Sequence, residues 1–261
     1  MKRVLKYTIL VCALAVAVLF ISMVSGMTSE QRHATACSEM DIIIRDSAQS
    51  SFIVKDDIRR FISEDYGTWL GQRIDSVDLR RLEDSLRRRS AIKDVEAYVT
   101  RDGRLHVEVS QREPVLYLKD GGKGFFADAD GCIIPVGKGT IKGLRQIEGV
   151  FPLSEPASHQ GIPDTEEERQ WLKGLLGFVD YLEADRFWSG YIKRVVSDSE
   201  GFLTLYPKEG KERFLFGYPE EYPRKFSRME KYYEYILPAR EKDYYKVVDV
   251  RWEGQIVCRE K

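Results

Sequence analysis

Side chains that could catalyse a reaction or hold a metal ion are few in this sequence and widely spaced. The three histidines, His33, His106 and His159, have no second ligand at helical or hairpin spacing, so no zinc site is predicted. The chain contains no G-x-S-x-G, no H-E-x-x-H, no phosphate-binding loop and no glycine-rich nucleotide fingerprint. Glu183 and Asp185 form a carboxylate pair, but positions two apart on a helix do not face each other. We therefore expect no catalytic residue, no metal site and no cofactor.

The stretch D-A-D-G at residues 128–131 resembles part of a calcium-binding loop. In an EF-hand it would occupy positions three to six, which places Phe126 at position one and Gly137 at position twelve. Neither residue offers a side-chain oxygen, so a plain turn is the favoured interpretation.

Composition indicates an ordinary globular protein. Of 261 residues, 43% are hydrophobic and 11% aromatic, which is enough to build cores. Lys and Arg number 41 and Asp and Glu 42, so the net charge of -1 favours no nucleic-acid partner. The arginines at 87–89 are interpreted as a solvated helix face. The cysteines have no C-x-x-C spacing, which excludes a zinc ribbon or a thioredoxin-type motif; they are Cys12, Cys37, Cys132 and Cys258.

The N-terminal segment has the features of a membrane anchor. Lys2, Arg3 and Lys6 precede an apolar run of 18 residues, Tyr7 to Val24. This run exceeds the signal-peptide core of about 7–15 residues and is just long enough to span a bilayer. Small residues at 24–26 and 34–36 leave a cleaved signal peptide as the alternative. By the positive-inside rule, we expect a cytoplasmic tail at 1–6, a transmembrane helix at 7–26 and a juxtamembrane linker at 27–39.

Residues 40–118 predict a small α+β domain. A β-branched strand at 40–45 is followed by a helix containing Ile58, Phe61 and Ile62 and by a second helix that Asp78 caps. A β-hairpin then begins near Asp94. A three-residue loop at 101–103, with Gly103 left-handed, places Val99 opposite Leu105 and gives both arms one common apolar face. The order strand, helix, helix, strand, strand implies a three-stranded sheet with both helices on one face.

The rest of the chain predicts a β-rich domain at 125–261, after a linker at 119–124. Thr165 and Glu168 form a capping box at the start of a long helix, and Pro238 ends a second one. The expected strands are at 125–136 (a hairpin), 144–150, 191–196, 202–206, 214–216, 245–252 and 255–259.

The last two strands are the predicted partner site. Glu253 and Gly254 turn the chain back, which places the final strand at a sheet edge where an extended partner can add a strand. Arg and Trp are the residue types that most often dominate interface energies. The candidate partner-binding residues are Arg251, Trp252, Gly254, Gln255, Ile256, Val257 and Arg259.

Three local motifs occur in an order that resembles the FtsQ/DivIB family of bacterial cell-division proteins. They are R-E-P at 112–114, D-A-D-G followed by C-I-I at 128–134, and V-D-V-R-W at 248–252. The resemblance implies a POTRA domain at 40–118, a β domain at 125–261 and a non-enzymatic scaffold of the divisome. It also implies partners of the FtsB and FtsL type, and an inner-membrane protein whose N-terminus is cytoplasmic and whose other domains are periplasmic.

Two other classes of protein remain as alternatives. A membrane-attached or secreted enzyme acting on cell wall or carbohydrate would use carboxylates such as Asp128 and Asp130, held several ångströms apart. A POTRA-bearing envelope assembly protein would carry repeated POTRA units or a barrel, and the sequence has no internal repeat.

Overall fold

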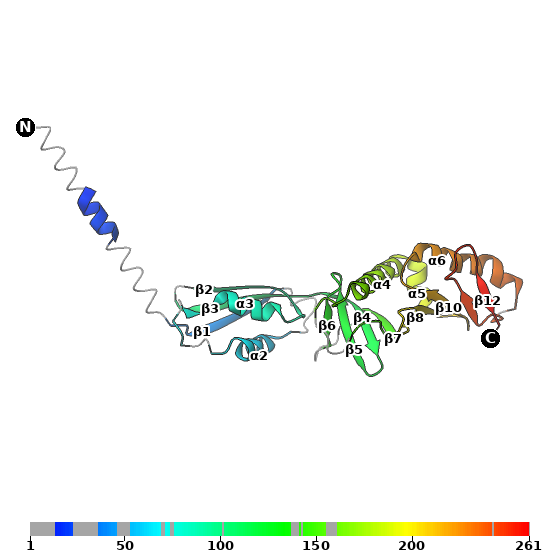
Figure 1. The fold of residues 1–261 in the computed structure, drawn as a ribbon, viewed down its shortest axis with the longest axis horizontal. Coiled ribbons are helices and arrows are strands. Elements are labelled where there is room, and N and C mark those ends of the chain that lie inside the picture. The colour runs from blue at the N-terminus through cyan, green and yellow to red at the C-terminus, as the bar shows by residue number, and fades with distance from the viewer. Residues whose placement is uncertain are drawn as a thin grey trace, which may run out of the picture. The chain divides into compact units, whose positions relative to one another are not determined.

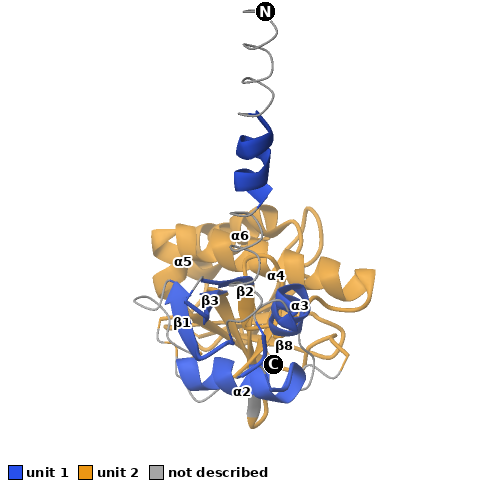
Figure 2. Ribbon diagram, turned by 90° about the vertical axis from the view of Figure 1, so that its left-hand side faces the viewer, with its two compact units in different colours: residues 1–45, 54–87, 94–110 blue, residues 46–53, 88–93, 111–261 orange. Residues whose placement is uncertain are grey.

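The computed structural model describes residues 14–22, 36–45, 53–68, 71–73, 76–100, 102–136, 141, 143–154, 161–241 and 243–260. The chain forms two compact units (Figure 2). Unit 1 comprises residues 1–45, 54–87 and 94–110, and unit 2 comprises residues 46–53, 88–93 and 111–261.

The predicted transmembrane segment lies largely outside the described residues. Residues 14–22 are helical, and Leu14, Leu19 and Phe20 on this helix are exposed. Among the described helices, none is both long and apolar enough to cross a membrane.

Unit 1 contains a three-stranded sheet with strand order β1-β3-β2. Its elements are β1 (Glu39–Arg45), α2 (Lys55–Asp65), α3 (Leu79–Arg87), β2 (Ile92–Val99) and β3 (Arg104–Gln111). The predicted element order is confirmed, and β1 pairs with β3 in parallel. Both helices lie on one face of the sheet (Figure 2). Alternate side chains of the strands pack against apolar side chains of the two helices. This core consists of Ile42, Ile58, Ile62, Leu82, Leu86, Val95, Leu105, Val107 and Val109.

Local signals in the sequence position these elements. The Asp78 carboxylate accepts a hydrogen bond from the Arg81 N–H (3.0 Å) and so caps α3 as predicted. The Thr100 N–H donates to the Arg104 carbonyl (2.9 Å), which closes the predicted three-residue loop. Gly103 has a φ of 87°, the left-handed conformation that this loop requires.

Unit 2 contains a nine-stranded sheet with strand order β12-β11-β10-β9-β8-β7-β4-β5-β6. Strands β8, β9 and β10 pair antiparallel, whereas the pairs β4·β7, β7·β8 and β10·β11 are parallel. The strands are β4 (Pro114–Asp120), β5 (Lys123–Asp128), β6 (Ile133–Pro135), β7 (Arg145–Gly149), β8 (Ile192–Ser197), β9 (Leu203–Pro207), β10 (Arg213–Gly217), β11 (Val247–Asp249) and β12 (Val257–Arg259).

Helices of unit 2 gather on one side of these strands (Figure 1). They are α4 (Glu166–Ala184), α5 (Arg186–Tyr191), α6 (Tyr222–Lys231), the π-helix η2 (Tyr232–Ile236) and the 3-10 helix η3 (Leu237–Ala239). The capping box of Thr165 and Glu168 is confirmed. Side chains of α4 and α6 pack with strand residues in one core, whose largest members include Trp171, Trp188, Phe178, Phe216 and Phe226.

Three sequence predictions differ from the structure. Residues 119–124 are not a linker, because β4 and β5 form a hairpin that turns at 121–122, and the division between the units falls at 110–111. Tyr191 ends α5 instead of starting a strand. The last two strands are shorter than predicted, at Val247–Asp249 and Val257–Arg259. Glycines occur both in linkers and in hairpin turns, and aromatic residues occur both in helices and in strands. The local sequence pattern therefore does not separate these alternatives.

Candidate partner-binding site

The last strand, β12, forms one edge of the nine-stranded sheet. It pairs antiparallel with β11, with Val248 opposite Cys258. The Arg259 carbonyl accepts a hydrogen bond from the Lys246 N–H (2.9 Å), so the backbone groups of Arg259 face β11. Because these directions alternate along a strand, the N–H and C=O of Cys258 point away from the sheet. Among the described residues, no side chain hydrogen-bonds to the backbone of β12.

A buried carboxylate holds two of the predicted residues beside this edge. The Asp249 side chain, 1% exposed, accepts hydrogen bonds from the Arg251 Nε (2.9 Å) and Nη2 (2.7 Å) and from the Trp252 Nε1 (3.2 Å). Burial by itself would raise the pKa of Asp249, but the hydrogen bonds from Arg251 outweigh it and hold the pKa below its ordinary value. The Trp252 side chain is 52% exposed, and its hydrogen bond to the buried Asp249 holds it in place at the surface.

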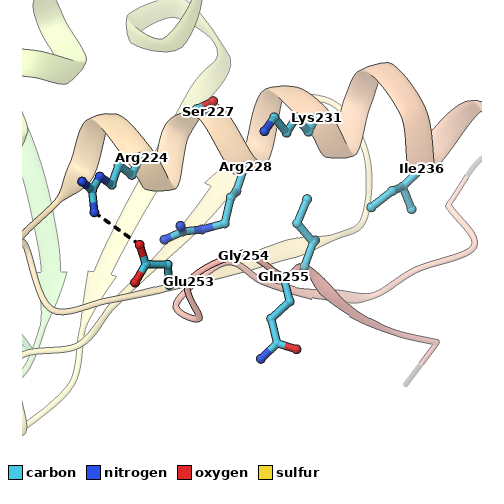
Figure 3. A pocket seen from close by; sticks show the side chains of 9 residues that line it. Arg224, Ser227, Arg228, Lys231, Ile236, Glu253, Gly254 and Gln255 are labelled. Carbon is cyan, nitrogen blue, oxygen red and sulfur yellow. Dashed lines mark hydrogen bonds and ion pairs between the residues drawn. The ribbon is translucent and has the colours of Figure 1, made fainter.

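A pocket of about 510 Å³ separates α6 from the turn that precedes β12 (Figure 3). Arg224 and Arg228 extend from α6 toward the turn. Arg228 Nε donates to the Val250 carbonyl (2.8 Å), and Arg224 pairs with Glu253 at 3.5 Å. The pocket lining thus contains three cationic side chains and one carboxylate. The full lining is Arg224, Ser227, Arg228, Lys231, Ile236, Glu253, Gly254, Gln255 and Ile256.

The predicted site residues fall into three neighbouring groups. Gly254, Gln255 and Ile256 line the pocket and precede β12, so the strand predicted to start at Gln255 begins two residues later. Val257 and Arg259 belong to β12, while Arg251 and Trp252 are held by Asp249.

Sequence reasoning did not include the basic residues of α6 in the site. Arg224, Arg228 and Lys231 follow one another at helical spacing, so their shared helix face was visible in the sequence. Their approach to residues 253–256 depends on the tertiary fold, which no local pattern reveals.

The aspartates of the D-A-D-G turn serve the fold. The buried Asp128 carboxylate accepts from Arg112 Nη1 (2.7 Å) and from the N–H groups of Asp130 (3.0 Å) and Cys132 (2.8 Å). Burial would lower the pKa of Arg112, but the hydrogen bond to Asp128 raises it above its ordinary value. These bonds make the predicted plain turn. Within the described part of the chain, no group of three or more His, Cys, Asp or Glu residues could hold a metal ion.

Comparison with known protein families places a domain boundary near residue 111, as the fold does. A family model described as a POTRA-like domain matches residues 35–110. A second, described as FtsQ/DivIB, C-terminal related, matches residues 113–259, which is more than half of the chain. A search of curated proteins found no match to the chain. The chain therefore belongs to the FtsQ/DivIB family of bacterial cell-division proteins.

Proposed function

We propose that this protein is a non-enzymatic, membrane-anchored scaffold of the divisome that captures partners of the FtsB and FtsL type. In this proposal an extended partner segment adds a strand to β12. The observation that supports it best is the outward N–H and C=O of Cys258 on an edge strand whose backbone no described side chain covers.

At two other sheet edges, nearby backbone segments form hydrogen bonds at or next to the edge strand. The Ile133 N–H of β6 donates to the Gly161 carbonyl (2.8 Å), and the Gly161 N–H donates back (3.0 Å). In unit 1, the Cys37 N–H just before β1 donates to the Gln72 carbonyl (2.8 Å). Natural proteins protect their sheet edges in this way, so an edge without cover marks a surface that is free to bind.

Side chains around β12 supply both anchoring and selectivity. The exposed Trp252 indole offers a large apolar contact that Asp249 has already ordered, which lowers the entropy lost on binding. The cationic pocket between α6 and the 253–256 turn favours an acidic side chain on the partner.

The membrane anchor rests on the N-terminal segment. Leu14, Leu19 and Phe20 are exposed on helix 14–22, within the apolar run Tyr7 to Val24. Exposed apolar side chains on a helix are stable in a bilayer, where the lipid covers them. The basic residues before the run favour a cytoplasmic N-terminus and periplasmic units.

Two variants test strand addition at β12. Cys258→Pro removes the outward N–H without removing a hydrogen bond to β11, and prolines are tolerated on edge strands. Trp252→Ala removes the anchor. Both variants should keep the wild-type circular dichroism while the Kd for an FtsB-type partner rises at least tenfold. Cys258→Pro should keep the wild-type melting temperature, whereas Trp252→Ala, which removes a hydrogen bond to Asp249, should lower it slightly. Tyr235→Ala, which truncates an exposed aromatic residue elsewhere, is the matched control and should bind normally. If both site variants fold and bind with wild-type affinity, the site lies elsewhere.

A further inference from the structure

We propose that Glu83, Arg87 and Asp94 form an edge clasp that closes the outer edge of β2 to strand addition. The strand lies at one end of the unit 1 sheet, with only β3 beside it. Such an edge would ordinarily present unpaired N–H and C=O groups to any extended chain.

Val95 and Ala97 are the residues whose backbone groups face outward. The Thr100 N–H donates to the Arg104 carbonyl of β3, so Thr100, Tyr98 and Glu96 face β3. Their neighbours Val95 and Ala97 therefore turn their N–H and C=O groups to the free edge.

Side chains occupy three of these outward groups. The Ala97 N–H donates to Glu83 Oε1 (2.8 Å), and Arg87 Nη2 donates to the Val95 carbonyl (2.6 Å). The Val95 N–H donates to Asp94 Oδ1 (2.9 Å). The clasp thus supplies donors and acceptors that the backbone of an added strand would otherwise supply.

Helix geometry explains why α3 can do this. Glu83 and Arg87 are four positions apart, a rise of about 6 Å along one helix face. Residues two apart on a strand are about 6.6 Å apart, so this pair can reach Val95 and Ala97 together. Arg87 also pairs with Glu83 at 3.3 Å and lies 3.7 Å from Asp94, which holds the clasp as one network.

The clasp deepens the proposed function. A partner that binds by strand addition would meet a closed edge on β2 and an open one on β12. The choice of β12 as the partner's edge rests on the proposed function, whereas the closure of β2 stands on the hydrogen bonds within unit 1.

Amide hydrogen exchange of the full-length chain tests the clasp directly. In the wild-type protein the amides of Val95 and Ala97 should exchange as slowly as those of Glu96 and Tyr98, although they face away from the sheet. Glu83→Ala should accelerate exchange of the Ala97 amide at least tenfold and leave Tyr98 unchanged. Asp84→Ala removes the neighbouring carboxylate, which pairs with Arg87 at 3.5 Å but does not accept from the Ala97 N–H; as the matched control it should leave Ala97 protected.

The wild-type measurement keeps the proposal testable if Glu83→Ala does not fold. Rapid exchange of Ala97 in the wild-type protein would overturn the proposal, and so would unchanged exchange in a folded Glu83→Ala variant.

A second experiment asks whether the clasp excludes an added strand. The double variant Glu83→Ala/Arg87→Ala, reconstituted in detergent, should self-associate at least tenfold more strongly than wild type in sedimentation velocity, through pairing of exposed β2 edges. Wild-type sedimentation together with rapid Ala97 exchange would overturn the proposal that these side chains close the edge. Capture of an FtsB-type partner should be unchanged in this variant, and its loss would count against the proposed function instead.

Discussion

Asp249→Asn should both loosen unit 2 and weaken partner capture. The substitution keeps the size of the side chain but removes the charge that holds Arg251 and Trp252. A hydrogen bond to a charged group contributes about 1.5–3 kcal/mol. The Arg251 side chain is 34% exposed, so water can replace part of the hydrogen bonding that its guanidinium loses. We therefore expect the free energy of unfolding to fall by about 2–3 kcal/mol in total.

The assay is thermal unfolding of the full-length protein followed by circular dichroism. For a unit of this size, 1 kcal/mol shifts the melting temperature by about 2–4 °C, so the expected decrease is about 4–12 °C. Partner affinity should fall about tenfold, because Trp252 loses the hydrogen bond that orders it. Glu253→Gln is the matched control, since this exposed carboxylate does not contact Arg251, and it should change stability by less than about 0.5 kcal/mol.

The stabilisation that the Asp249 carboxylate provides should depend on pH. The pKa of Asp249 is lowered in the folded state, so its contribution is complete above the ordinary value of 3.8 and is lost as the pH falls through the lower, folded value. The difference between wild type and Asp249→Asn should therefore be constant at neutral pH and vanish in strong acid. A difference that persists unchanged in strong acid, or no difference at pH 7, would refute the assigned role of this carboxylate.

Two further predictions concern the fold and the membrane segment. Gly149→Ala should destabilise unit 2 by at least about 3 kcal/mol, because the φ of Gly149 is 118° and a Cβ would lie 2.0 Å from the Ser197 carbonyl oxygen. Gly190→Ala is the control and should change stability little, because a Cβ at Gly190 meets nothing within 4 Å. Equal melting temperatures of the two variants would contradict this prediction. N-terminal sequencing of the protein from membranes should find the apolar run retained, and a mature chain beginning near Met27 or Cys37 would contradict the anchor.

Local signals in the sequence predicted most of the elements. Thr165 and Glu168 identify the start of α4 because each satisfies a backbone group of the other. Gly103 identifies the β2–β3 loop because the required register leaves one left-handed position. The glycines at 121–122 did not separate a linker from a hairpin turn, since both use the same residues. The parallel pairing of β7 with β4 and β8 joins distant segments, which periodicity cannot show.

The candidate site was predicted only in part, for the same reason. The turn at Glu253 and Gly254 predicted that the chain returns alongside the preceding strand, and β12 pairs antiparallel with β11 at the sheet edge. The Asp249 contacts and the basic face of α6 depend on distant parts of the chain meeting in space. Arg251 was predicted to bind a partner, and in the structure its guanidinium is bonded to the buried Asp249 carboxylate, which also accepts from Trp252.

Amide exchange at Cys258 tests the central claim most directly. In the free protein the outward N–H of Cys258 should exchange rapidly, while Arg259, which faces β11, is protected. Saturation with an FtsB-type partner should slow exchange of the Cys258 amide at least tenfold, because the added strand accepts its hydrogen bond. Unchanged exchange of the Cys258 amide in the saturated complex would contradict strand addition at β12.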